Sequence, residues 1–418
     1  MKRFFYLLIA AISISTVQGQ QQRTCGTHDR YLQAIQNDPS IALRRAQLEK
    51  QVQEWISRQP AQRTAGGTVL VTVPVVVHVL NYNNTQAISD AQVLSQIDVL
   101  NKDYSFTNSD TGLVPAAFKP RTSNTQIQFC MATVDPSGVP TTGIERRAVT
   151  VTRIGNTSRY YNVAQGGLAA WDRNRYLNFW ICDIDGGNTL GYTYLPGTVP
   201  ASYDGVVIDY RYWGTIGTVF APFNKGRTAT HEVGHWFNLE HIWADEPSCS
   251  ADDYVADTPQ QKGENYGCPS YPQTTQSGGR CVSTDPSAMF MNYMDYTDDA
   301  CMYMFTSGQS ARMQAALNTS RASLFTSNGC QSPTNVASIP SLGASVYPNP
   351  SSGAFEFSTY FSGDVNVTIL DITGRSVMSK IFLQNEPKRF DLTDFPDGVY
   401  IVRFESDGRR DVRRIVKN

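Results

Sequence analysis

The sequence predicts an α/β (α+β) domain with a mixed twisted sheet, followed by a smaller all-β sandwich. From about residue 66, β-branched runs that suit buried strands alternate with helical patterns, which is typical of α/β domains. A predicted helix with two histidines four residues apart follows these strands. Beyond Cys330, short strand-like segments are separated by turn signals such as Thr373-Gly374 and Asp397-Gly398, which is the spacing of a small β-sandwich.

The first 19 residues predict export. Lys2 and Arg3 precede an apolar run from Phe4 to Ile14 and then small and polar residues, which is the order of a secretory signal peptide. This run is too short to span a membrane, and no second apolar stretch of spanning length follows. The mature chain is therefore expected to be secreted or held at the cell surface, where disulfides are permitted for its eight cysteines.

The net charge argues against two classes of partner. The chain has 418 residues, enough for two or three domains, with 35 Lys and Arg against 37 Asp and Glu. This balance gives no reason to expect a nucleic acid or an acidic membrane surface as a partner.

Residues 20–57 form a polar, charged stretch that we interpret as a separate N-terminal segment. Within it, Asp38-Pro39 is typical of a helix start, because proline suits the first helical position.

The next predicted domain spans residues 58–330. A buried strand is expected at residues 68–80, and Ser89 is expected to cap a helix that ends near Tyr104. His78 lies within the first strand, and we interpret it as a core residue rather than a metal ligand. Further strands are predicted at residues 126–134, 176–184, 190–195 and 205–210.

Two of these strands carry a cysteine, and one offers a candidate edge of the sheet. Cys130 and Cys182 either pair with each other or fill the core as small apolar residues, and the sequence leaves both open. Gly191–Tyr194 is the candidate edge, to which an extended peptide could add as a further strand.

Residues 231–241 carry the clearest chemical signal. His231, Glu232 and His235 form an H-E-x-x-H pattern, which places two imidazoles about 40° apart around a helix, so both can bind one metal. His241 would point away if the helix continued, so the helix is expected to end near Asn238, a residue that tolerates the left-handed conformation. The bare pattern also arises by chance, but three of the chain's five histidines fall within these eleven residues.

Three neutral imidazoles and an open fourth position form a catalytic zinc arrangement. Glu232 lies beside the first imidazole, where its carboxylate can take a proton from the attacking water. We therefore predict a zinc-dependent endopeptidase. The alternative is a non-catalytic adhesion or binding protein with a structural zinc, but such a site normally closes its coordination with a fourth protein ligand and has no use for Glu232.

Cys25 has two interpretations. Its thiolate could fill the open zinc position and hold the enzyme inactive until residues 20–57 are removed as a pro-segment. Otherwise Cys25 forms a disulfide, for example with Cys330. We favour the first interpretation.

The region after the histidines is rich in loops. Cys249, Cys268, Cys281 and Cys301 allow three disulfide connectivities, and their spacing does not choose among them. Residues 252–258 combine carboxylates with backbone carbonyls, which suits calcium, although a solvated acidic turn accounts for them equally well. Residues 307–325 predict an amphipathic helix that closes the domain.

The histidine motif, followed by Asn292-Tyr293-Met294-Asp295-Tyr296, resembles the metzincin clan of zinc peptidases and in particular its pappalysin family. The resemblance covers residues 23–330. It implies a metzincin-like catalytic domain with an active-site helix, and Asn238 replaces the glycine of most metzincins, as is common in this family. The implied roles are zinc binding by His231, His235 and His241, general base and acid for Glu232, the turn under the zinc for Met294, and stabilisation of the tetrahedral intermediate for Tyr296.

The resemblance has further implications for latency and specificity. Cys25 would block the zinc in the zymogen, and Asp299 would lie at the base of the S1′ pocket, where it selects Arg, less often Lys, after the scissile bond. Self-processing on the amino side of Arg58 would follow the same preference. The family also implies disulfides Cys249–Cys281 and Cys268–Cys301, and calcium bound near Asp253, Val255 and Thr258.

The C-terminal part differs in composition. Residues 331–345 form a predicted linker, and residues 346–418 contain the short strands. Tyr347-Pro348-Asn349-Pro350, with the later segments 370–375 and 397–402, resembles the C-terminal sorting domain of the type IX secretion system. The resemblance implies passage across the outer membrane by this machinery, with removal of the domain. We also expect a monomeric peptidase that acts on proteins and peptides. A carbohydrate- or protein-binding β module is the alternative.

Overall fold

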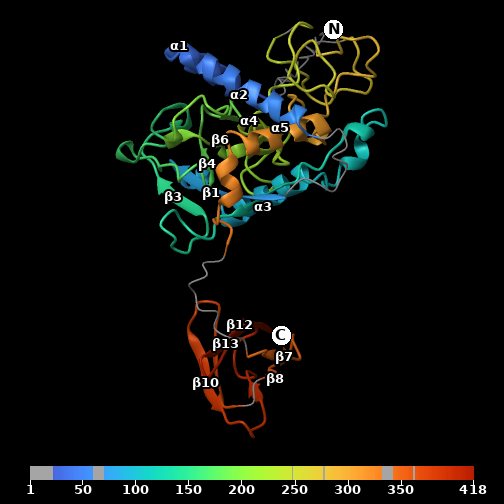
Figure 1. Ribbon diagram of the computed structural model, residues 1–418. Helices are drawn as coiled ribbons and strands as arrows, with labels where there is room; N and C mark the ends of the chain where they lie inside the picture. The colour runs from blue at the N-terminus through green and yellow to red at the C-terminus, as the bar shows by residue number, and fades with distance from the viewer. Residues whose placement is uncertain (1–21, 60–69, 247, 276–277, 332–341, 361–362) are drawn as a thin grey trace, which may run out of the picture. The chain divides into compact units, whose positions relative to one another are not determined.

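The computed structural model describes residues 22–59, 70–246, 248–275, 278–331, 342–360 and 363–418. The predicted signal peptide and most of the predicted linker lie outside these residues. The chain divides into two compact units, residues 1–332 and 333–418 (Figure 1).

Among the described residues, the first unit is built on a six-stranded sheet. The strand order is β2-β1-β4-β6-β5, and β3 also pairs with β1. All pairings are parallel except that of β5, which runs antiparallel to β6 at the edge of the sheet. The sheet is mixed, as the sequence predicts. Its strands are β1 (Val71–Asn81), β2 (Ile127–Met131), β3 (Ile144–Ala148), β4 (Leu177–Cys182), β5 (Gly191–Thr193) and β6 (Val206–Asp209).

Two helices cover the face of the sheet that carries the main core. α3 (Asp90–Tyr104) packs against β2, and α4 (Arg227–Trp236) packs against α3, β5 and β6. Ser89 caps α3 as predicted, because its hydroxyl accepts a hydrogen bond from the Gln92 N–H at 3.1 Å. The buried side chains between these elements include Val73, Val75, Leu100, Phe179, Ile208 and Val233. This packing fixes α4 beside the edge strand β5.

His78 is a core residue, as the sequence indicates. It is fully buried in β1. Its Nδ1 lies 2.7 Å from Glu145 Oε2, and its Nε2 lies 3.0 Å from Asn178 Oδ1.

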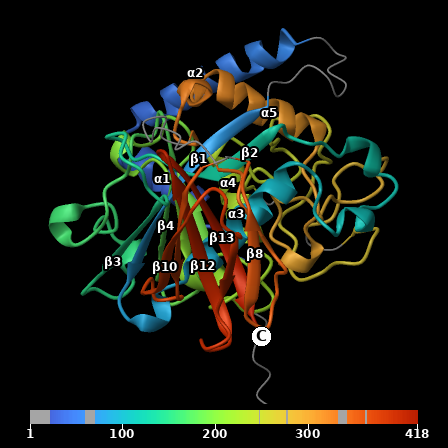
Figure 2. The same cartoon turned by 90° about the horizontal axis from the view of Figure 1, so that it is seen from below.

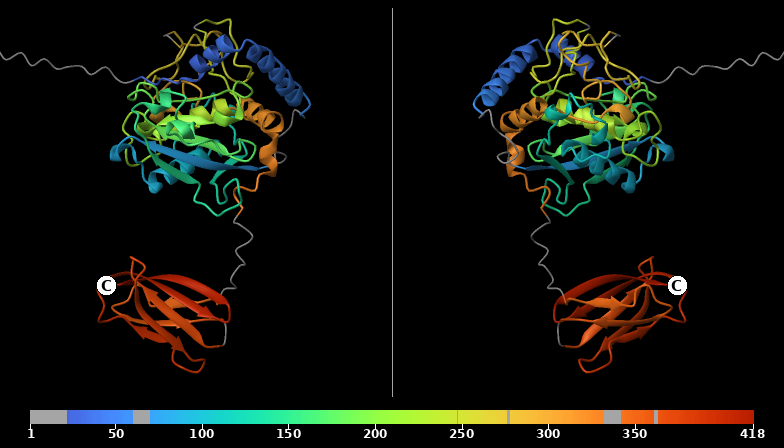
Figure 3. Two further views of the ribbon diagram at one scale, coloured as in Figure 1. Left: turned by 90° about the vertical axis from the view of Figure 1, so that its left-hand side faces the viewer. Right: turned by 90° about the vertical axis from the view of Figure 1, so that its right-hand side faces the viewer.

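The N-terminal segment forms two helices where the sequence predicts one. α1 (Thr27–Asn37) precedes α2 (Ser40–Ser57), which begins directly after Asp38-Pro39, and the Asp38 carboxylate accepts a hydrogen bond from the Ser40 N–H at 3.0 Å. The residue before α1 is Gly26, which offers no side-chain cap that could reveal this helix in the sequence. α2 lies along α5 (Ser307–Asn318) (Figures 2 and 3).

α5 is shorter than predicted. The sequence predicts a helix to residue 325, but α5 ends at Asn318 and a short 3-10 helix, Ala322–Thr326, follows. The Thr319 hydroxyl donates a hydrogen bond to the Ala315 carbonyl at 2.8 Å, and the Ser320 hydroxyl donates one to the Ala316 carbonyl at 3.4 Å. Such side-chain bonds compete with the helical backbone pattern and favour its termination.

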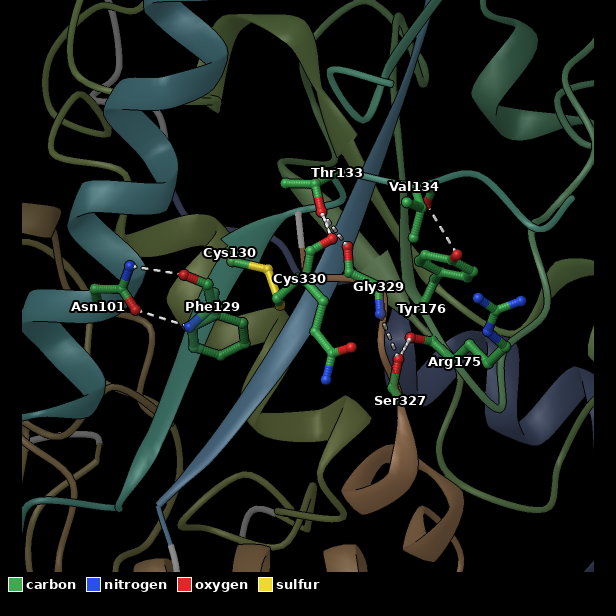
Figure 4. Close-up of a disulfide and its surroundings, with 11 residues drawn as sticks. Asn101, Phe129, Cys130, Thr133, Val134, Arg175, Tyr176, Ser327, Gly329 and Cys330 are labelled. Atoms are coloured by element: carbon green, nitrogen blue, oxygen red, sulfur yellow. Dashed lines mark hydrogen bonds between the residues drawn. A yellow bond between two sulfur atoms is a disulfide. The ribbon is translucent and has the colours of Figure 1, made fainter. Parts of the chain in front are cut away.

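The described residues contain three disulfides. Cys249 pairs with Cys281 and Cys268 with Cys301, which is the connectivity that the family resemblance implies. The third, Cys130–Cys330, ties β2 to the end of the first unit (Figure 4). It rules out the two pairings considered from the sequence, Cys130–Cys182 and Cys25–Cys330. In the sheet, β1 lies between β2, which carries Cys130, and β4, which carries Cys182. Cys182 and Cys25 are buried and free of disulfides in the part described.

The second unit contains two antiparallel sheets among its described residues, in agreement with the predicted sandwich. One has the order β10-β9-β12-β13 and the other β11-β8-β7. Phe357 from one sheet packs against Phe404 from the other, with ring centroids 5.1 Å apart, inside a shared apolar core. The strands are β7 (Ser345–Tyr347), β8 (Ala354–Ser358), β9 (Val365–Leu370), β10 (Ser376–Phe382), β11 (Arg389–Asp391), β12 (Gly398–Ser406) and β13 (Arg409–Lys417).

Candidate active site

Helix α4 presents the first two histidines and ends where the sequence predicts. All its residues from Arg227 to Trp236 are buried. Asn238 has a left-handed backbone with φ of 73°. The Asn238 N–H donates to the His235 carbonyl at 2.8 Å, and the Leu239 N–H donates to the Gly234 carbonyl at 3.0 Å. These two bonds form a Schellman motif, which turns the chain back so that His241 can approach the helix.

The three imidazoles converge on one point. The Nε2 atoms of His231, His235 and His241 lie 3.0 to 3.2 Å from one another. Each Nδ1 faces an acceptor. That of His231 lies 2.7 Å from the Tyr293 carbonyl, and that of His235 lies 2.7 Å from the Leu239 carbonyl. That of His241 lies 2.5 Å from Asp245 Oδ1. These acceptors hold the proton on Nδ1 and aim the Nε2 lone pairs at the shared point, as in metal sites.

The charge state of the rings agrees with metal binding. Burial, followed by the neighbouring rings, lowers the pKa of His231 well below its usual value. The same causes lower the pKa of His235 to about 3. The two imidazoles are therefore neutral at physiological pH, which is the form that binds a metal.

A sulfur completes the set of metal-binding groups. One ligand atom each from Cys25, His231, His235 and His241 lies within 4.8 Å of all the others, and all four residues are buried. Three imidazole nitrogens and one thiol sulfur in a tetrahedral arrangement are typical zinc ligands. The residues present therefore fit zinc, and Cys25 is placed to occupy the position that a catalytic zinc keeps open.

Glu232 lies beside the imidazoles and contacts the N-terminal segment. Its Oε2 accepts hydrogen bonds from the Thr27 hydroxyl at 2.9 Å and from the Cys25 thiol at 3.4 Å. Burial raises the pKa of its carboxyl to about 7. Thr27 was not expected from the sequence, because its role depends on the strand-like course of the chain before α1.

Met294 and Tyr296 both lie close to the histidine motif. Met294 is fully buried under α4, where a Cβ atom at Gly234 would come within 2.5 Å of its sulfur, so the helix needs glycine there. The Tyr296 ring lies 4.9 Å from the His241 ring, and its hydroxyl donates a hydrogen bond to the Cys25 carbonyl at 3.4 Å.

Asp299 binds an arginine that sequence reasoning missed. Arg23 is 2% exposed, and its Nη2 lies 2.6 Å from Asp299 Oδ1. Its Nε donates to the Thr297 carbonyl at 3.1 Å, and its guanidinium carbon lies 5.0 Å from the Phe223 ring centroid. The sequence offered one signal for this contact, a basic residue two positions before Cys25.

The N-terminal segment runs along the edge strand β5. The Gly26 N–H donates to the Gly191 carbonyl at 2.9 Å, and the Leu190 N–H donates to the Thr24 carbonyl at 3.0 Å. The pairing of Cys25 with Gly191 is parallel. The candidate edge, Gly191–Tyr194, is thus at the margin of the sheet and holds an extended segment, although β5 itself ends at Thr193.

The helices of the N-terminal segment add ion pairs to the same face. Arg312 forms two hydrogen bonds with Glu49 of α2, both at 2.7 Å. Arg45 of α2 donates to Asn238 Oδ1 at 2.5 Å and to Glu240 Oε1 at 3.0 Å.

The candidate calcium residues gather several oxygen atoms. The Thr258 hydroxyl lies 3.0 and 2.9 Å from the two Asp253 carboxylate oxygens and 2.7 Å from the Val255 carbonyl. Asp253 is 4% exposed, and burial raises the pKa of its carboxyl well above its usual value. Converging oxygen atoms around a buried carboxylate suit a hard cation.

Comparison with known proteins identifies both units. Residues 163–318 match the family model described as pregnancy-associated plasma protein-A, and residues 345–418 match a secretion system C-terminal sorting domain. An extracellular metalloprotease of Arthroderma otae is 30% identical over 66% of this chain and 88% of its own length. One from Colletotrichum graminicola is 30% identical over 77% of this chain and 99% of its own.

Solved structures of peptidases are also similar to this chain. A promirolysin mutant from Tannerella forsythia has a TM-score of 0.64 and 40% identity, over 73% of this chain and 97% of its own. Mature mirolysin from the same organism, in complex with a cleaved peptide, has a TM-score of 0.57 and 44% identity, over 62% of this chain and 96% of its own.

The sorting domain and the extracellular relatives show that the protein is exported, to the medium or to the cell surface. Among the described residues, no helix combines the length and apolar character needed to cross a membrane. The zinc-binding geometry and the relatives together identify the chain as a secreted zinc metallopeptidase that belongs to the pregnancy-associated plasma protein-A, or pappalysin, family and resembles mirolysin.

Proposed function

We propose that the protein is made as a zymogen which, once processed, hydrolyses peptide bonds on the amino side of Arg and, less often, Lys. The observation that carries the proposal is the path of residues 23–27. Arg23 lies against Asp299, Cys25 lies among the imidazoles, and Thr27 binds Glu232. One segment thus covers the metal ligands, the candidate base and a buried carboxylate that suits a guanidinium.

Residues of this chain supply the parts of a hydrolytic mechanism. His231, His235 and His241 would hold the zinc, which when bound supplies a Lewis acid and lowers the pKa of water to about 7. Glu232 takes the proton of the attacking water and delivers it to the leaving amine. The Tyr296 hydroxyl, which now donates to the Cys25 carbonyl, donates to the oxyanion of the substrate.

Asp299 determines the residue after the scissile bond. Its Oδ2 accepts hydrogen bonds from the Lys225 N–H at 2.8 Å and the Arg227 N–H at 3.3 Å, and its Oδ1 faces Arg23. A buried carboxylate left without a cation is costly, so a substrate guanidinium is favoured. Arginine also presents an Nε–H to the Thr297 carbonyl, which a lysine ammonium does not reproduce in the same geometry.

Cleavage of a proteome-derived peptide library by the processed enzyme tests this preference. We expect Arg, and less often Lys, after most cleaved bonds. In Asp299→Asn, kcat/KM for arginine peptides should fall by about 30-fold, because a charged hydrogen bond contributes about 2 kcal/mol. Peptides with Leu at that position serve as the control. An unchanged preference in the variant would refute the role of Asp299.

The proposed processing site is the Ser57–Arg58 bond. Arg58 lies just after α2, and its side chain is 77% exposed. Cleavage there separates α1 and α2 from the catalytic domain. Sequencing the mature N-terminus tests the site, and a start far from Arg58 would contradict it.

We also propose a structural calcium bound by Asp253, Val255 and Thr258, and a monomeric mature enzyme. The oxygen atoms that converge around Asp253 support the calcium site. Sedimentation of the mature enzyme tests whether it is monomeric.

Recognition of residues 346–418 by the type IX machinery would be followed by removal of the sorting domain, which mass spectrometry of the exported protein can detect.

A further inference from the structure

We propose that the mature enzyme has a second subsite for a basic side chain of the substrate, formed by the ring of Tyr192 together with Asn156 and Asp185. This inference rests on the proposed function, because it takes the Asp299 pocket as the site of the residue after the scissile bond.

The order of contacts along the N-terminal segment places this subsite. Arg23 lies at Asp299, Cys25 lies at the imidazoles, and Arg30 lies over Tyr192. The segment therefore contacts the Asp299 pocket before it reaches the metal ligands, and it contacts Tyr192 after it has passed them. If Asp299 takes the residue after the scissile bond, then the ring of Tyr192 faces residues before it.

The contacts of Arg30 show what chemistry the subsite accepts. The guanidinium carbon lies 4.0 Å from the centroid of the Tyr192 ring, and Nη2 donates to Asn156 Oδ1 at 3.0 Å. A cation stacked on an aromatic face and bound by an oxygen acceptor is a cation–π site with one directional hydrogen bond.

The receiving surface is built into the catalytic domain. The Tyr192 hydroxyl donates to the Gly155 carbonyl at 2.6 Å, which fixes the ring, and the residue is buried. Tyr194 packs edge-on against it with centroids 5.9 Å apart. The ring is therefore held in place without help from α1.

After removal of the N-terminal segment, the subsite keeps an open volume and groups that attract a cation. Arg30 lines a hollow of about 300 Å³ together with Asn156, Asp185, Thr189 and Tyr192 of the catalytic domain. The Asp185 carboxylate accepts hydrogen bonds from the N–H and hydroxyl of Thr189, at 2.9 and 2.7 Å, which hold it at this wall. Removal of α1 takes away the arginine and leaves an aromatic face, an amide oxygen and a carboxylate, all of which attract a cation.

A peptide series tests the subsite. Each fluorogenic peptide carries Arg after the scissile bond and either Arg or Ala at one of the four positions before it. At one position, Arg should raise kcat/KM over Ala by about three- to fivefold, through a lower KM, as expected for a partly exposed cation–π contact. In Tyr192→Leu this ratio should fall to about one, and in Asn156→Ala it should fall partway. Asn174→Ala, an exposed asparagine elsewhere, is the matched control and should keep the ratio.

A second measurement uses wild-type enzyme and so does not depend on the folding of a variant. A peptide of residues 22–37 should inhibit the mature enzyme, and Arg30→Ala in that peptide should raise its inhibition constant by about three- to fivefold, whereas Arg30→Lys should retain most of the effect. Equal inhibition by all three peptides, or no position at which Arg exceeds Ala, would overturn the subsite. Failure to cut any peptide with Arg after the bond would instead refute the proposed function.

Discussion

At the scale of single residues, the site contains two buried carboxylates whose partners come from the N-terminal segment. Glu232 accepts hydrogen bonds from Thr27 and Cys25, and Asp299 binds Arg23. A buried carboxylate is stable only when it is paired or hydrogen-bonded. Under the proposed function, removal of the segment would leave Glu232 ready to take a proton and Asp299 ready to bind a substrate guanidinium.

The role of Glu232 can be tested without disturbing the metal ligands. In Glu232→Gln, processed by added wild-type enzyme, kcat should fall by about 10²- to 10⁴-fold, which is the usual contribution of a general base. Zinc content, measured by elemental analysis, should remain one per chain, because the three imidazoles are unchanged. Full activity in the variant would contradict the assignment.

At the scale of elements, the N-terminal segment makes two kinds of contact with the catalytic domain. Residues 23–27 pair with the edge strand β5, and α2 lies along α5 through the Glu49–Arg312 pair. The extended part covers the site, whereas the helical part is held by ion pairs and apolar contact. Because the two parts are continuous, we expect a pro-segment that is cut after α2 to keep both kinds of contact until it dissociates.

Because Cys25 covers the metal ligands, we expect its replacement to make the zymogen active before it is processed. In Cys25→Ala, the purified zymogen should cleave a fluorogenic arginine peptide before processing and should mature faster than wild type, since the fourth metal position is open to water. Cys182→Ala, which changes the other free cysteine among the described residues, is the matched control and should remain latent. A silent Cys25→Ala zymogen would show that the ion pairs of α2 suffice.

At the scale of the whole molecule, cross-links hold together regions with little regular structure. Cys249–Cys281 and Cys268–Cys301 lie in the loops that follow α4, and Cys130–Cys330 joins residues 200 positions apart (Figure 4). A cross-link over so long a loop restricts the unfolded chain more than a short one does.

Loss of the long cross-link should therefore lower stability more than activity. The double variant Cys130→Ser, Cys330→Ser should lose about 2–4 kcal/mol in the free energy of unfolding, measured by denaturant titration of the mature enzyme. Because the bond lies in the β2 region and away from the histidines, kcat/KM of the folded fraction should stay near the wild-type value. An unchanged midpoint would contradict a stabilising role.

The oxygen cluster at Asp253 predicts a separate dependence on calcium. A calcium-selective chelator should lower the thermal midpoint of the mature enzyme, and added calcium should restore it while zinc content stays constant. In Asp253→Asn the midpoint should no longer respond to calcium, since a carboxylate ligand is lost. A wild-type midpoint that is the same with and without calcium would argue for a purely hydrogen-bonded turn.

The sequence by itself determined the chemistry and the architecture. The spacing of His231, Glu232 and His235 specified a metal helix because helical geometry is local, and Asn238 ended it because few residues tolerate φ of 73°. β-Branched apolar runs predicted strands of the first unit, and short strand-like segments with turn signals predicted the β-sandwich of the second. These features depend on residues close together in the chain.

Only the tertiary structure decided which distant groups meet. Arg23 and Asp299 lie 276 positions apart. Cys130 meets Cys330 rather than Cys182, since β1 separates β2 from β4, the strand of Cys182. α1 had no capping signal, and the course of residues 23–27 depends on the exposed edge of β5. The physical reason is that such contacts depend on how the sheet and helices pack, which no local pattern in the sequence encodes.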